Sequence, residues 1–220
     1  MTTTERLLDA ASAIWEGYHV HPFVCGIADG TLDVEKFKFY MVQDYVYLFD
    51  YARVFPLGVV KAKEPETMRT FAAYVHQILD GEMSLHRSYM QRLGIDLLEA
   101  EHAVCALDNK SYTAYMLEIA SKEGEAEIAA AILSCAVSYE VIARRILENN
   151  PNAADHPFYG EWIESYAGDE YHAANEALIA LMDRLTAEYS EAQLQHLCDV
   201  FVLCSRYEAL FWDMAWEMKL

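Results

Sequence analysis

The sequence predicts an all-helical protein, in which a single domain spans residues 1–220 as a multi-helix bundle. Apolar residues recur at helical spacing along nearly the whole chain. Only nine Gly and five Pro occur in 220 residues, which argues against disorder and against a turn-rich all-β fold. With 54% apolar residues and no stretch of strand-like alternation, the chain can bury one full-sized helical core.

Capping and helix-ending residues give the expected bounds of each helix. The first expected helix begins at a capping box of Thr2 and Glu5 and ends at Gly17, and a loop over 17–32 follows, with turns at His21-Pro22 and Asp29-Gly30. The next helix is expected from Asp33 to about 61, with a kink at Pro56, and another from Pro65 to Gly94. After a short polar segment come helices near 111–123 and 125–150, a short one from His156-Pro157 to Gly168, one over 169–188, and a last helix that begins at a capping box of Ser190 and Gln193.

Charge and cysteine content exclude several classes of function. The net charge is −19, from 16 basic and 35 acidic residues, so the chain is expected to repel nucleic acid phosphates. The N-terminus lacks a leader pattern, and no uncharged apolar run is long enough for a bilayer. The five cysteines are odd in number and include no C-x-x-C, so we expect neither a disulfide framework nor a zinc site. A reducing cytoplasm is the expected location.

One predicted helix carries an acid on an aromatic face. Tyr40, Asp44, Tyr47 and Tyr51 are spaced at i, i+4, i+7 and i+11, so they share one side. A carboxylate there loses hydration unless a partner compensates for it. The structural alternative is an acid that bonds a neighbouring Tyr or Arg in the core.

Two later helices place a thiol and an acid in similar settings. Cys135 and Tyr139 are four residues apart and face the same way, although a lone cysteine is commonly a small buried hydrophobe. Glu208 stands near Phe211 at helical spacing, where partial burial favours proton transfer near neutral pH. Its structural alternative is an ion pair with Arg206 or another Arg. Together the three helices predict a pocket for a planar heterocycle with hydrogen-bond donors.

Several short segments follow one another in a recognisable order. They are His21–Leu32, Phe37–Leu48, Glu82–His86, Ser134-Cys135, Tyr139-Glu140, His156-Pro157, Trp162-Ile163, Tyr166, Tyr207-Glu208 and Phe211–Ala215. On this ordered set the sequence resembles the TenA/thiaminase II family over nearly its whole length. It departs from the family's Cys-x-Trp pattern, because Ala136, Val137 and Ser138 follow the cysteine.

The resemblance implies a haem oxygenase-like fold, a homotetramer and a cytoplasmic hydrolase. The implied reaction converts 4-amino-5-aminomethyl-2-methylpyrimidine to the hydroxymethyl compound and ammonia, with thiamin as a secondary substrate. Cys135 matches the family nucleophile, Asp44 the acid that grips the pyrimidine amino group, and Glu208 the acid beside a ring nitrogen. The matching pocket-lining residues are Tyr47, Tyr112, Tyr139, Tyr166 and Phe211. Because the ring can act as the electron sink, neither a metal nor an organic cofactor is expected.

Two rival functions remain open on sequence grounds. A metal-dependent oxygenase on the same fold requires Glu-x-x-His pairs on two helices; Glu99-x-x-His102 has that spacing in a short segment, and Asp169-x-x-His172 is a poorer match. Glu82 and His86 are four residues apart and are expected to form a buried hydrogen-bonded pair. The second rival is a non-catalytic pyrimidine-binding or regulatory protein, for which a retained thiol has no use.

Overall fold

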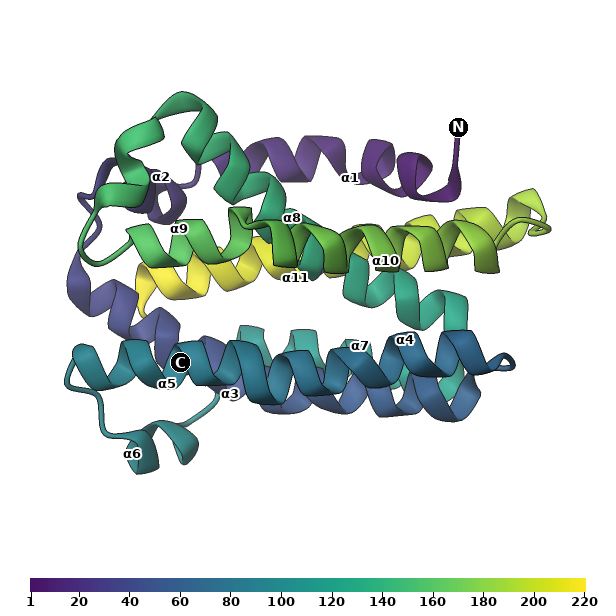
Figure 1. The fold of residues 1–220 in the computed structure, drawn as a ribbon, viewed down its shortest axis with the longest axis horizontal. Coiled ribbons are helices and arrows are strands. Elements are labelled where there is room, and N and C mark those ends of the chain that lie inside the picture. Colours follow the sequence, from purple (N-terminus) through teal and green to yellow (C-terminus); the bar gives the residue numbers. More distant parts are fainter. The chain divides into compact units, whose positions relative to one another are not determined.

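The computed structural model describes residues 1–220, and all of its regular elements are helices (Figure 1). The predicted all-helical class is therefore confirmed. The elements are α1 (Thr3–His19), α2 (Pro22–Asp29), α3 (Val34–Lys61), α4 (Pro65–His76), the π-helix η1 (Gln77–Glu82), α5 (Met83–Arg92), α6 (Leu97–Glu101), α7 (Leu107–Lys122), α8 (Glu125–Asn149), the 3-10 helix η2 (Pro151–Asp155), α9 (Gly160–Ala167), α10 (Asp169–Leu185) and α11 (Glu191–Glu217).

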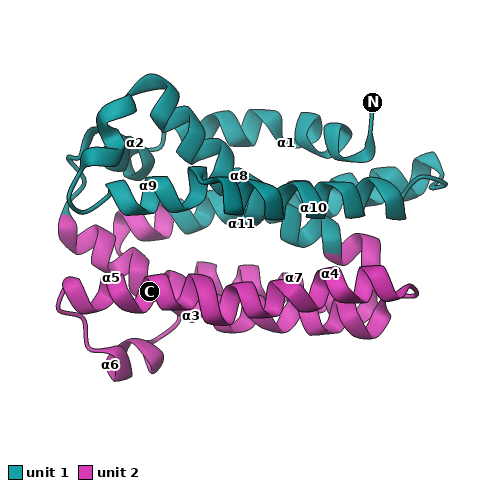
Figure 2. Ribbon diagram, viewed as in Figure 1, with its two compact units in different colours: residues 1–33, 129–212 teal, residues 34–128, 213–220 magenta.

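The chain forms two compact units (Figure 2). Unit 1 comprises Met1–Asp33 and Ala129–Trp212, and within it α10 packs against α1 and α9. Unit 2 comprises Val34–Ile128 and Asp213–Leu220, and within it α3 packs against α4, α5 and α7 (Figure 1). The assignment of 1–220 to a single domain stays a prediction.

The first helix begins as predicted but ends later. Thr2 and Glu5 form the reciprocal capping box, in which each side chain accepts from the other's backbone N–H. The helix continues past Gly17 to His19, because Gly17 has an ordinary helical conformation and Tyr18 continues the buried face.

The expected loop over 17–32 is wrong, because α2 lies within it. His21 is the N-cap of α2, where its Nδ1 accepts the backbone N–H of Phe23, and Pro22 is in the first turn. Gly30 ends the helix at a φ of 71°, in the left-handed region that favours glycine. The two turn signals were thus the start and the stop of a short helix.

The helix expected from Pro65 to Gly94 is a run of three elements rather than one. A six-residue π-helix, Gln77–Glu82, separates α4 from α5, and Gly94 lies just beyond the end with a φ of 72°. The predicted start of the following helix, near residue 111, is wrong, because α7 begins at Leu107. Likewise α9 begins at Gly160, because His156 caps a turn ahead of it by accepting two backbone N–H groups.

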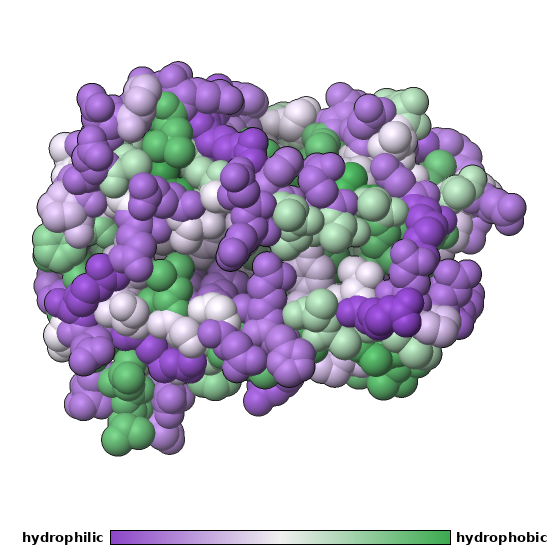
Figure 3. All heavy atoms as spheres, in the orientation of Figure 1, coloured by the Kyte–Doolittle hydropathy of each residue, from purple (hydrophilic) through white to green (hydrophobic).

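Helix α8 is both long and strongly apolar. By length and composition alone it could cross a membrane, although no membrane-spanning run was predicted from the sequence. However, 89% of its most apolar stretch is buried inside the protein, as in the core helix of a globular fold. Hydrophilic side chains are spread over the face of the molecule seen in Figure 3, which agrees with the acidic composition.

Candidate functional site

Cys135 lies on α8 in unit 1, one turn before an aromatic cluster that includes Tyr139. Cys135 is 9% exposed, and Ser138 Oγ donates to its carbonyl at 3.0 Å. One turn along, the ring of Tyr139 lies 4.8 Å from that of Tyr166 and 5.2 Å from that of Trp212. Tyr139, on the same helix as Cys135, therefore belongs to an aromatic cluster of unit 1.

Glu208 is 1% exposed on α11, whereas Arg206 two residues earlier is exposed. The two side chains thus point in different directions, which removes Arg206 as the expected ion-pair partner. Phe211, on the same helix, is also buried. The acid is therefore fully buried, rather than partly buried as predicted from the sequence.

A serine that sequence reasoning missed ties the thiol helix to the acid helix. Ser205, one turn before Glu208, shares a 3.0 Å hydrogen bond with Ser134, the neighbour of Cys135. Trp15 Nε1 donates to Ser205 Oγ at 3.0 Å, and the Tyr18 hydroxyl donates to the Ser205 carbonyl. This buried hub fixes α8 against α11 beside both reactive groups.

Electrostatic effects within unit 1 place the thiol and the acid near one phenol. Burial, and then the charges of Glu208 and Cys135, raise the pKa of Tyr18 above its ordinary value. Burial, and then the charge of Glu208, raise the pKa of Cys204 well above the usual range of a thiol. Cys204 is therefore a structural cysteine, held in the protonated and unreactive form.

A second polar network braces the segment after Cys135. Glu140 accepts from His172 Nδ1 at 2.6 Å and from Asn175 Nδ2 at 2.7 Å, and Arg144 lies 2.8 Å away. Asn175 Nδ2 also donates to the Ala136 carbonyl at 3.1 Å. The buried charge of Glu140 is thus compensated, and α10 is attached to α8 next to the thiol.

In unit 2, Asp44 of α3 pairs with His86 of α5. His86 Nε2 lies 2.7 Å from Asp44 Oδ2, and both side chains are buried. The other ring nitrogen, Nδ1, lies 2.9 Å from the backbone carbonyl of Glu82. The predicted partner of Asp44, a Tyr or an Arg, is therefore a histidine, and His86 bonds the Glu82 backbone rather than its side chain.

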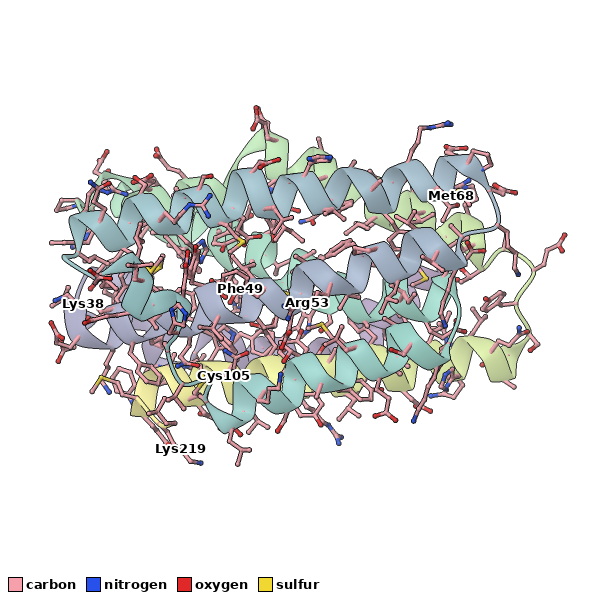
Figure 4. The ribbon with its side chains drawn as sticks, turned by 90° about the horizontal axis from the view of Figure 1, so that it is seen from below. Lys38, Phe49, Arg53, Met68, Cys105 and Lys219 are labelled. Atoms are coloured by element: carbon pink, nitrogen blue, oxygen red, sulfur yellow. The ribbon has the colours of Figure 1, made fainter.

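Gln43, next to Asp44, organises the segment that leads into α7. Its Nε2 donates to the Val104 carbonyl and its Oε1 accepts the backbone N–H of Ala106, both at 2.9 Å. Asn109 Nδ2 donates to the Gln43 carbonyl at 2.7 Å. Figure 4 labels Cys105 within this segment, and Phe49 and Arg53 farther along α3. These bonds set the start of the helix that carries Tyr112.

Two of the four tyrosines predicted to line a pocket, Tyr47 and Tyr112, lie together in unit 2, whereas Tyr139 and Tyr166 lie in unit 1. The ring of Tyr47 lies 5.5 Å from that of Tyr112 and 5.2 Å from that of Tyr51. The face shared by Tyr40, Asp44, Tyr47 and Tyr51 is buried along its length, as its spacing predicted. Unit 2 thus presents one acid on an aromatic helix face.

The residues considered for a metal have other contacts. His102 Nδ1 lies 2.8 Å from the Leu98 carbonyl, His172 pairs with Glu140, and His86 pairs with Asp44. No group of three or more His, Cys, Asp or Glu side chains is arranged to hold a metal ion.

Comparison with known proteins gives the family. The model of the TENA/THI-4/PQQC family matches residues 8–218. The aminopyrimidine aminohydrolase of Helicobacter pylori is 45% identical to this chain over 99% of it and 100% of the relative. The structure of a TenA homologue from P. horikoshii OT3 is 29% identical, with a TM-score of 0.90 over 99% of both chains. A heme oxygenase-like domain from Shewanella denitrificans, 14% identical, has a TM-score of 0.79 over 98% of this chain and 92% of its own, which confirms the predicted fold type. The chain therefore belongs to the TENA/THI-4/PQQC family.

Proposed function

We propose that this protein is an aminopyrimidine aminohydrolase that serves thiamin salvage. Its substrate is 4-amino-5-aminomethyl-2-methylpyrimidine, and its products are the 5-hydroxymethyl compound and ammonia. In support, the relative that is 45% identical over its full length is named an aminopyrimidine aminohydrolase. The observation that carries the proposal is the Ser134–Ser205 bond, which joins the helix of the thiol to the helix of the buried acid.

The proposed reaction uses Cys135 as a nucleophile. Its thiolate adds to a ring carbon of the pyrimidine while Glu208 gives a proton to a ring nitrogen, so the ring loses its aromaticity. The amine of the methylene arm is protonated, and the electron pair of the adduct expels it as ammonia. Water adds to the methylene carbon of the exocyclic alkene that remains and gives up one proton, and loss of the thiolate, with return of the ring proton to Glu208, restores the aromatic ring. Covalent catalysis of this kind replaces one difficult displacement with easier steps.

The other predicted site residues have binding roles in this proposal. Asp44 accepts a hydrogen bond from the 4-amino group. Tyr112 and Tyr166 hold the leaving amine or the incoming water. Tyr47, Tyr139 and Phe211 supply flat apolar walls, which suit a planar heterocycle.

Ammonia release from a small substrate panel tests the function. The panel contains the aminomethyl pyrimidine, its N-formyl derivative and thiamin. We expect the free aminomethyl compound to have the highest kcat/KM and thiamin a lower one. Failure to release ammonia from the aminomethyl compound, combined with tight pyrimidine binding, would instead support a non-catalytic pyrimidine-binding protein.

We also propose that the enzyme works in the cytoplasm as a homotetramer, with small molecules and neither nucleic acid nor membrane as partners. The net charge of −19 opposes binding to phosphate backbones and anionic lipids. Light scattering coupled to size exclusion tests the assembly, and a monomeric mass at working concentration contradicts it.

A further inference from the structure

We propose that His86 is a positioning and specificity residue, which makes one oxygen of Asp44 an obligatory hydrogen-bond acceptor and so selects 4-amino over 4-oxo pyrimidines. The inference rests on the proposed function, because it assumes that Asp44 meets the substituent at position 4 of the ring. From the sequence, His86 was expected only to form a buried hydrogen bond with Glu82. The inference follows from the contacts of the two ring nitrogens.

The first contact fixes the tautomer of His86. Its Nδ1 lies 2.9 Å from the carbonyl oxygen of Glu82, and a carbonyl oxygen can only accept a hydrogen bond. Nδ1 therefore carries a hydrogen. Glu82 is the last residue of the π-helix η1, a rare kind of turn that is frequent at functional sites.

The second contact fixes which atom of Asp44 can carry a proton. His86 Nε2 and Asp44 Oδ2 lie 2.7 Å apart and are bridged by one hydrogen. That hydrogen belongs either to an imidazolium, which donates to a carboxylate, or to a carboxylic acid, which donates to a neutral ring. In both cases it lies between Nε2 and Oδ2.

The other oxygen, Asp44 Oδ1, is consequently an acceptor in either state. An exocyclic amino group at ring position 4 offers the N–H that such an oxygen needs. A carbonyl at the same position places two acceptors against each other in a buried setting, where an unmatched polar group is costly. The hydrogen bond to His86 thus prevents Asp44 from donating a hydrogen bond to the ligand, so that Asp44 favours a 4-amino group over a 4-oxo group.

Loss of His86 removes this restriction. A buried Asp44 without a basic partner can take up a proton on either oxygen and donate it, so that a 4-oxo ring becomes an acceptable ligand. A purely structural role for His86 predicts a different result, in which the affinities for amino and oxo ligands fall by the same factor. The ratio of the two affinities separates these roles.

The test compares the binding of two ligands by calorimetry. The ligands are 4-amino-5-hydroxymethyl-2-methylpyrimidine and its 4-oxo counterpart, and the proteins are wild type, His86→Leu and His86→Gln. We expect wild type to prefer the amino ligand, His86→Leu to lose about tenfold or more of that preference, and His86→Gln, whose amide can still donate to Asp44, to lose less. An unchanged ratio in a folded His86→Leu protein overturns the inference.

The matched control is His102→Leu. His102 makes the same kind of contact, from Nδ1 to the carbonyl four residues earlier, but it is exposed at the end of α6, whereas Asp44 pairs with His86. This variant should keep the wild-type ratio.

A measurement on wild type protects the test against a variant that does not fold. The ¹⁵N spectrum of histidine-labelled protein should show Nδ1 of His86 protonated, and an unprotonated Nδ1 overturns the inference. Because these readouts are ligand binding and protonation, they are separate from ammonia release. If wild type released no ammonia, the proposed function would fail on its own.

Discussion

Cys135 and Glu208 are the two residues proposed to carry out the reaction, as nucleophile and proton donor. Both side chains are buried on neighbouring helices of unit 1, and both raise the pKa of the same phenol, Tyr18, after the larger effect of burial. Cys204, by contrast, is a fully buried thiol whose raised pKa keeps it protonated. Unit 1 therefore holds both a structural cysteine, Cys204 on α11, and a candidate nucleophile, Cys135 on α8.

Replacement of Glu208 by Gln tests its role as a proton carrier. The amide keeps the shape and can still form hydrogen bonds, but it cannot transfer a proton. We expect kcat to fall by roughly 10²- to 10⁴-fold with a much smaller change in KM. Steady-state kinetics give the result, with the exposed Glu188→Gln as the control. A higher KM at unchanged kcat contradicts the assignment.

The His86–Asp44 pair predicts a pH dependence of stability. Burial alone lowers the pKa of His86, but the hydrogen bond and charge of Asp44 outweigh it, so the folded-state pKa is raised above 6.5. A raised folded pKa means that the stabilisation is complete below the unfolded pKa and is lost as the pH rises through the folded value.

Urea unfolding at a series of pH values checks this sign. The free energy of unfolding lost in His86→Gln, relative to wild type, should be largest below pH 6.5 and should shrink as the pH rises. A loss that grows with pH contradicts it.

At this scale the sequence predicted residue types better than partners. The spacing of Tyr40, Asp44 and Tyr47 indicated a buried helix face, and the structure confirms it. The partner His86 was missed because it lies 42 residues away, where no local pattern links the two. Ser205 gave no signal at all, since one serine in an amphipathic helix is unremarkable before its neighbours are known.

At the scale of elements, glycines separate tight contacts from open surface. Gly160 begins α9 where an added Cβ would lie 1.9 Å from the carbonyl oxygen of Ala154. Gly17, inside α1, has no atom within 4 Å of the same position. The two positions form a matched pair for the same substitution.

Alanine should therefore have opposite effects at these two sites. Gly160→Ala is expected to destabilise the protein by about 3 kcal/mol or more, because backbone must move to admit the methyl group. Gly17→Ala should stabilise it by roughly 0.5–1 kcal/mol through helix propensity. Chemical denaturation measures both, and equal effects at the two sites would show that the close approach at Gly160 is wrong.

Helix interiors were predictable from sequence, but several boundaries and one kind of turn were not. Periodicity and caps located α8 and α10 well. The loop expected over 17–32 failed because His21-Pro22 and Gly30 suit a turn and a short helix equally. The π-helix was missed since one extra residue in a long helical run barely disturbs the apolar pattern.

At the scale of the whole molecule, the acidic surplus is the dominant feature. With a net charge of −19, the acidic side chains repel one another in the compact state, and salt screens that repulsion over a Debye length of about 10 Å at 0.1 M. We expect Tm to rise when NaCl is added at low ionic strength, with KCl acting equally. A Tm that falls under both salts contradicts this prediction.

Class and family were accessible from sequence, because the ordered motifs span the chain and the match to residues 8–218 confirms them. The departure after Cys135 was visible as well. Its surroundings were not, since Asn175, 39 residues along the chain on α10, bonds both the Ala136 carbonyl and the Glu140 side chain of α8. Long-range polar contacts of this kind have no signature in the local pattern.

The central claim is that the sulfur of Cys135 performs the chemistry. Ammonia release from 4-amino-5-aminomethyl-2-methylpyrimidine by Cys135→Ser, beside wild type and the partly exposed Cys105→Ser control, tests it most directly. Turnover should vanish in Cys135→Ser, with an unchanged circular dichroism spectrum, and persist in Cys105→Ser. Ammonia release at the wild-type rate by a folded Cys135→Ser protein would contradict covalent catalysis.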